Sequence, residues 1–136
     1  MSSVRFIKDR HGYINFQGGT DIPIEILGHF LMTDNHCSKN SWQDWAKEAK
    51  SLRDDQFPHT VGSNITFLEI DQNEIISMYN DLDHNELEEK APHLKISVDQ
   101  FVELLDEWYE RVCKQQPQEV LLKYENNTYT LEIIQQ

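Results

Sequence analysis

The sequence is poor in cysteine and has no long apolar run. Cys37 and Cys113 are the two cysteines among 136 residues, too few for the disulfide framework of a small secreted domain. Nothing in their spacing favours pairing, so we expect incidental thiols in a reducing compartment. No apolar run approaches the roughly 20 residues of a membrane span. Lys8, Asp9 and Arg10 directly follow a short apolar start, unlike a signal peptide. We therefore expect a cytoplasmic protein that does not bind membranes.

Basic residues are also scarce. Twelve Lys and Arg residues stand against 24 Asp and Glu residues, which gives a formal net charge of −12. A compact protein with this charge repels phosphates, which argues against direct binding of DNA or RNA and favours a basic protein partner. Hydrophobic residues make up 38% and aromatic residues 10% of the chain, enough for a packed core. The length predicts a single domain over residues 1–136.

Motifs for catalysis and metal binding are missing. The chain has no P-loop, no G-x-S-x-G and no H-E-x-x-H. The six histidines are scattered, and Asp81-x-Asp83 lacks the glycine and the final glutamate of a calcium loop. We expect no metal, no cofactor and no enzyme activity. The alternative is a small hydrolase that uses Cys37 with one of the histidines as its base.

Alternating apolar residues predict three β-hairpins, over about residues 4–16, 65–79 and 120–133. A short strand is expected over residues 94–96. Pro58 and Gly62 predict that residues 53–64 form a loop. The polar stretch 81–93, which Pro92 ends, gives the weakest structural signal.

Apolar residues at helical spacing predict three helices. The first spans about 22–32 and contains Gly28, which costs about 1 kcal/mol relative to alanine and indicates a close neighbour. The second begins at Ser41, and the third spans about 98–115 behind a capping box that starts at Ser97. The order of elements predicts an α+β fold, with an antiparallel sheet of sequential hairpins and the helices on one face. The expected core is Phe6, Leu27, Phe30, Trp45, Phe67, Phe101, Leu105, Trp108, Leu122 and Leu131.

Acidic residues gather in the second half of the chain. Residues 81–110 contain ten Asp and Glu residues and two lysines. A solvated helix face and a polar loop would explain this charge as well as a docking surface does. We expect the partner to bind where the second hairpin passes into the acidic loop, because a rigid strand and an adaptable loop together suit a specific contact. The predicted contact residues are Asp71, Glu74, Tyr79, Asp81, Asp83, Glu86, Glu88 and Glu89. The next candidates lie on the long helix, at Glu103, Asp106, Glu107 and Glu110.

Three segments resemble a known class of proteins. They are IPIEILGHFLMTD at 22–34, ITFLEID at 65–71 and ISVDQFVELLDEW at 96–108. Together they are similar to immunity proteins of bacterial polymorphic toxin systems, especially those of contact-dependent growth inhibition. The resemblance implies a cytoplasmic protein without catalytic residues that binds one cognate toxin domain, often a nuclease, and neutralises it. The resemblance identifies no contact residue in this chain, because the residues that contact the toxin differ from partner to partner in such proteins.

The charge agrees with this expectation. A nuclease presents basic residues to hold phosphates, and an acidic inhibitor occupies that surface after fast, electrostatically steered association. The alternative is a housekeeping acidic adaptor with no toxin partner. The oligomeric state stays open.

Overall fold

The computed structural model describes residues 1–35, 37, 41–51, 59–62, 66–80 and 94–135. Its strands are β1 (Ser2–Lys8), β2 (Ile14–Gly19), β3 (His59–Gly62), β4 (Thr66–Ile70), β5 (Ile75–Asn80), β6 (Leu94–Ser97), β7 (Glu119–Glu125) and β8 (Thr128–Gln135). Its α-helices are α1 (Ile22–His29), α2 (Ser41–Ser51) and α3 (Val98–Glu107). Two π-helical turns, η1 (Phe30–Asp34) and η4 (Trp108–Cys113), continue α1 and α3. The α+β class is therefore confirmed.

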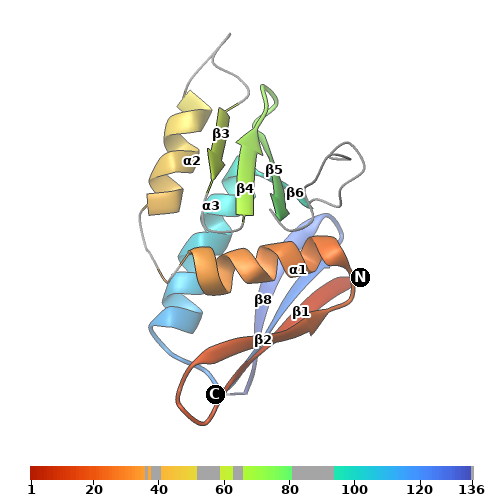
Figure 1. The fold of residues 1–136 in the computed structure, drawn as a ribbon, viewed down its shortest axis with the longest axis vertical. Helices are drawn as coiled ribbons and strands as arrows, with labels where there is room; N and C mark the ends of the chain where they lie inside the picture. The colour runs from red at the N-terminus through yellow and green to blue at the C-terminus, as the bar shows by residue number, and fades with distance from the viewer. Residues whose placement is uncertain (36, 38–40, 52–58, 63–65, 81–93, 136) are drawn as a thin grey trace.

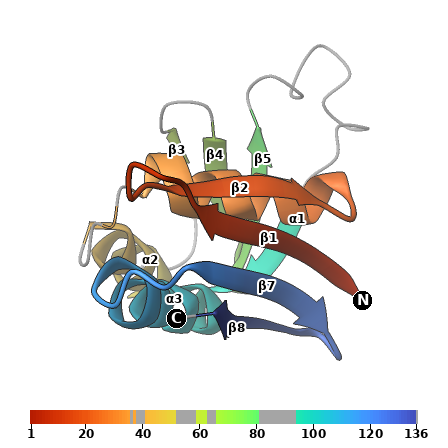
Figure 2. The same cartoon turned by 90° about the horizontal axis from the view of Figure 1, so that it is seen from below.

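The strands form two antiparallel sheets rather than the single sheet expected. Sheet A has the order β2-β1-β7-β8 and sheet B the order β3-β4-β5-β6. The cause is a long-range pairing: β1 joins β7, with Val4 opposite Leu122 and Phe6 opposite Val120, so the third hairpin extends the first hairpin and not the second. Helix α1 contacts both sheets and crosses their junction (Figure 1), so the helices do not share one face. Helices α2 and α3 pack together on the opposite side of the molecule (Figure 2).

One predicted loop contains a strand. Residues His59–Gly62 form β3, which pairs with β4 through Thr60 opposite Glu69 and Val61 opposite Leu68. Pro58 and Gly62 are breakers in isolation, but pairing with a neighbouring strand overrides this local tendency. Sheet B thereby gains its fourth strand.

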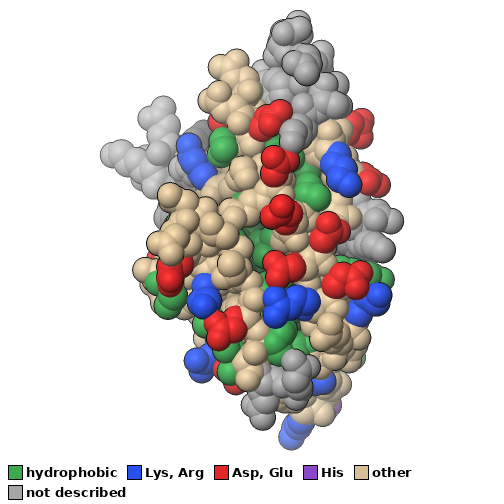
Figure 3. All heavy atoms as spheres, turned by 180° about the vertical axis from the view of Figure 1, so that it is seen from behind, with side chains coloured by type: hydrophobic (Ala, Val, Ile, Leu, Met, Phe, Trp, Pro, Cys, Tyr) green, Lys and Arg blue, Asp and Glu red, His purple; other side chains and the backbone are tan. Residues whose placement is uncertain are grey.

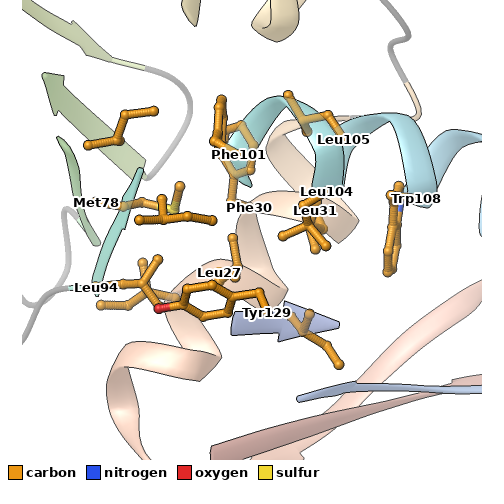
Figure 4. Packing of buried hydrophobic residues seen from close by; sticks show 14 of the residues in the cluster. Leu27, Phe30, Leu31, Met78, Leu94, Phe101, Leu104, Leu105, Trp108 and Tyr129 are labelled. Carbon is orange, nitrogen blue, oxygen red and sulfur yellow. The ribbon is translucent and has the colours of Figure 1, made fainter. Parts of the chain in front are cut away.

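The core joins the helices to both sheets. Eight of the ten predicted core residues are buried; Trp45 is partly buried against the core, and the Phe67 side chain lies outside the described part of the chain. The ring of Phe30 packs against those of Trp42 and Phe101, with centroids 4.9 and 5.7 Å apart. These contacts link the end of α1 to α2 and α3. Figure 4 shows Phe30 and Phe101 together, with Leu27 and Tyr129 nearby.

Side chains cap the two helices that begin next to strands. The Ser97 hydroxyl accepts a hydrogen bond from the amide of Gln100 at 3.2 Å, as the sequence predicts for α3. The Asp21 carboxylate accepts one from the amide of Ile24 at 3.0 Å and so caps α1. Both caps satisfy amides that have no partner within the helix.

Gly28 has the close neighbour that its position in a helix indicates. A Cβ atom at this site would lie 3.2 Å from Cγ1 of Val4 and 3.4 Å from the Phe6 ring. The glycine therefore allows α1 to approach β1 closely.

We expect Gly28→Val to lower the free energy of unfolding by about 1–3 kcal/mol, because it overpacks this contact. Urea denaturation measures the change. The same substitution in a Val4→Ala background provides the control, since the smaller side chain makes room for it. An equal cost in both backgrounds would show that Val4 is not the obstacle.

Candidate functional site

Two of the predicted contact residues, Asp71 and Glu74, shape the turn between β4 and β5. Oδ1 of Asp71 accepts hydrogen bonds from the amides of Asn73 at 2.8 Å and Ile75 at 3.2 Å. Glu74 has a φ of +63°, and its carbonyl accepts a hydrogen bond from the amide of Val98 at 3.0 Å. Both acids therefore lie beside the start of α3.

The other predicted contact residues lie elsewhere or outside the described residues. Tyr79 is near the far end of β5, where its backbone pairs with Phe67. A strand of this length separates its two ends by about 17 Å, so Tyr79 lies far along β5 from Asp71 and Glu74. The remaining predicted residues, Asp81, Asp83, Glu86, Glu88 and Glu89, lie outside the described part of the chain.

The described acidic residues concentrate on α3 and its continuation η4. Four carboxylates, those of Asp99, Glu103, Asp106 and Glu110, are exposed. They are spaced by four, three and four residues, which places them along one side of a helix. We call these four residues the α3 acidic stripe. Figure 3 shows the face on which α3 lies, with acidic side chains running down its middle.

Within the described residues, a lysine pairs with the C-terminal member of this stripe: Lys114 forms an ion pair with Glu110 at 3.3 Å. Next to the stripe, Arg111 forms an ion pair with Glu107 at 2.8 Å. Arg111 also donates to the carbonyl of Leu131 and so ties η4 to β8. Near the middle, the buried amide of Gln43 on α2 donates to Asp106. The stripe is thus fixed by its neighbours and keeps a negative charge.

A second candidate is a cavity of about 430 Å³ between the start of α1, β6 and the β7–β8 hairpin. Its walls include Asp21, Lys95, Tyr124 and Tyr129. The two tyrosine rings face each other across the hairpin, with centroids 4.4 Å apart and planes at 33°. Burial raises the pKa of Tyr129, and the nearby Tyr124 and Asp21 raise it further.

This cavity was not predicted from the sequence. The turn at 125–127 predicts that Tyr124 and Tyr129 face each other across the hairpin, as they do in the register. Nothing local in the sequence brings α1 and β6 to that hairpin.

The cysteines do not remain thiols in this structure. Cys37 and Cys113 form a disulfide, with Cα atoms 5.8 Å apart. The expectation of incidental thiols is therefore wrong, because the fold brings together two cysteines that are 76 positions apart in the sequence. In this form Cys37 offers no thiolate, so the hydrolase alternative lacks its nucleophile.

Within the described residues, no group of three or more His, Cys, Asp or Glu side chains is placed to hold a metal ion. No helix in the same part of the chain is both long and apolar enough to cross a membrane. Comparison of the chain with known protein families, with characterised proteins and with solved structures gave no match.

Proposed function

We propose that this chain is an acidic binding protein that neutralises a basic protein partner. The α3 acidic stripe carries the proposal, because it places four exposed carboxylates on one side of a helix. The helix is held by the Ser97 cap, the Gln43 contact and the Arg111 bridge to β8. A rigid surface of one charge gives fast association with a surface of the opposite charge.

The partner that best suits this surface is a toxin domain that acts on nucleic acid. Such a domain needs basic residues at its phosphate-binding groove, and the α3 acidic stripe offers carboxylates in place of phosphates. The resemblance of segments 22–34, 65–71 and 96–108 to toxin-immunity proteins supports the same proposal. The protein would act in the cytoplasm, where it covers the toxin groove or a site beside it.

Co-expression tests the proposal. The gene next to the one that encodes this chain is inspected for a secreted protein with a toxic C-terminal domain, and that domain is expressed in a bacterial host with and without this chain. We expect growth only when both are present, and inhibition of the purified toxin at a 1:1 ratio. A neighbouring metabolic operon, or continued killing with both proteins present, would favour the housekeeping adaptor instead.

Charge reversal on the stripe should slow association with the toxin domain. We expect Glu103→Lys/Glu110→Lys to lower the association rate constant about tenfold or more at low salt, with a smaller loss at high salt. Stability should change little, because both residues are exposed. Surface plasmon resonance at several salt concentrations measures the rates.

A matched control is available on sheet A. Glu125→Lys/Glu132→Lys makes the same change in charge. It also breaks one ion pair with a lysine, that of Lys123 with Glu132 at 2.7 Å, as the stripe variant breaks that of Lys114 with Glu110. These residues lie on the face of sheet A that carries Lys123, away from the buried face that packs against the helices. If the two double variants slow association equally, the effect comes from net charge and the stripe is not the docking face.

A further inference from the structure

The cavity between α1, β6 and the β7–β8 hairpin is built from apolar and aromatic side chains with one carboxylate in its wall. Ile24 and Leu94, which are 1% and 3% exposed, line it on the core side. Tyr124 and Tyr129 form an aromatic wall, and Asp21 and Lys95 also line the cavity. Figure 4 shows Tyr129 with its hydroxyl directed toward Leu94. The volume, about 430 Å³, is within the range of ligand pockets.

Each hydroxyl group of the described lining already donates its hydrogen in a hydrogen bond to another group of the protein. Ser2 donates to Oδ2 of Asp21. Tyr129 donates to the carbonyl of Lys95 at 3.1 Å, and Tyr124 donates to Oδ1 of Asn127 at 3.2 Å. Toward a guest, these oxygens can only accept hydrogen bonds. The Asp21 carboxylate keeps accepting capacity as well, because two protein donors do not saturate its lone pairs.

The charges around the cavity also favour a cationic guest. Asp21 contributes to the raised pKa of Tyr129, so its negative charge acts on the tyrosine hydroxyl. Acceptor oxygens and aromatic faces both attract a cation that carries several N–H donors. Lys95 is the opposing charge in the described lining, and its side chain is exposed, so its flexible stem allows the ammonium to leave the cavity.

We propose that this cavity receives a guanidinium group, the side chain of an arginine on the basic partner. The two rings are 4.4 Å apart and cover each other's inner faces. The planar guanidinium therefore stacks on an outer face of the tyrosine pair and donates hydrogen bonds to Asp21. The identity of the arginine's owner rests on the proposed function, whereas the preference of the cavity for a guanidinium does not. The pocket would add an anchor of defined shape to the less specific attraction of the α3 acidic stripe.

The test uses small probes and the whole chain. Binding of n-butylguanidinium, neutral butyramide and anionic butyrate is followed by NMR through the ring signals of Tyr124 and Tyr129. We expect n-butylguanidinium to shift both sets of signals, and the other two probes to bind at least about tenfold more weakly. Tighter binding of butyrate would identify an anion site at Lys95 and overturn the proposal. So would the absence of ring shifts with n-butylguanidinium at the highest soluble concentration.

Two charge variants separate the contributions of Asp21 and Lys95. Asp21→Asn removes the charge but keeps a good helix cap, so the fold is preserved. We expect it to weaken n-butylguanidinium binding about tenfold, and Lys95→Gln to strengthen the same binding. Glu125→Gln is the control, since it removes an exposed acid that is next to Tyr124 in the sequence and lies outside the described walls of the cavity. Equal affinities for the parent and Asp21→Asn would contradict the proposal.

The same variants distinguish this proposal from the proposed function. Asp21→Asn should weaken the complex with the toxin domain, and the partner should lose the same affinity when the relevant arginine is changed to glutamine. If n-butylguanidinium binds as expected but Asp21→Asn leaves the toxin complex unchanged, the partner does not use the cavity and the docking proposal is wrong. If the chain gives no protection against the toxin domain but prefers n-butylguanidinium, the proposed function fails while the cation preference stands.

Discussion

Reduction of the Cys37–Cys113 disulfide is expected to lower the free energy of unfolding by about 4 kcal/mol. The bond closes a loop with a sequence separation of 76 residues, and constraint of the unfolded chain by a loop of this length stabilises by about 4–5 kcal/mol in the chain-entropy description. The bond also ties the segment after η1 to η4, because Cys37 follows η1 and Cys113 ends η4. Its loss therefore removes a direct tie between the ends of α1 and α3.

Urea denaturation with and without a phosphine reductant measures this effect. Cys37→Ala/Cys113→Ala is the control, since it should show the stability of the reduced protein and should not respond to reductant. Equal midpoints for the oxidised parent, the reduced parent and the double variant would mean that the bond contributes nothing to stability.

The disulfide bears directly on the proposed location. Cytoplasmic reductants keep most thiols reduced, so a cytoplasmic inhibitor must hold its docking face without this bond. The α3 acidic stripe has other supports: the Ser97 cap at its start, Gln43 from α2 and the Arg111 bond to β8. Toxin binding by the double alanine variant should therefore equal that of the parent at a temperature where both are folded.

The sequence predicts the local elements well because their signals are local. The capping box at Ser97, the apolar stripe of α3 and the turn at 125–127 each depend on a few neighbouring residues. The close approach at Gly28 also follows from a single residue in a helix that would otherwise prefer alanine. These signals are sufficient for the α+β class.

The remaining features depend on contacts between distant residues. Pairing of β1 with β7 divides the strands into two sheets, and pairing with β4 turns His59–Gly62 into a strand. The disulfide and the cavity at Asp21 likewise join segments far apart in the chain. Residue spacing in a single sequence carries no information on these contacts. The predicted docking segment also depends on such contacts: β5 places Asp71 and Glu74 beside α3 and away from Asn80, and the acidic residues after Asn80 lie outside the described part of the chain.

Trp108 should be the most costly single side chain to truncate among the predicted core residues. It is 2% exposed, and its ring packs edge-on against Phe6 with centroids 4.9 Å apart, so it links the end of α3 to sheet A. We expect Trp108→Ala to lower the free energy of unfolding by about 3–5 kcal/mol, through lost burial and the cavity left behind. Urea denaturation measures the loss, and a value below about 1 kcal/mol would remove Trp108 from the core.

Trp108→Phe separates packing from hydrogen bonding at the same site. The indole Nε1 is buried and has no hydrogen-bond partner among the described residues, so an aromatic ring without this donor keeps much of the packing and leaves no polar atom buried without a partner. We expect Trp108→Phe to cost less than half as much as Trp108→Ala. Trp108 also lines a cavity together with Cys37 and Cys113, so its substitution and loss of the disulfide should not be additive. If Trp108→Ala lowers the free energy of unfolding by the same amount in the oxidised and in the reduced protein, the ring and the disulfide stabilise the end of α3 independently.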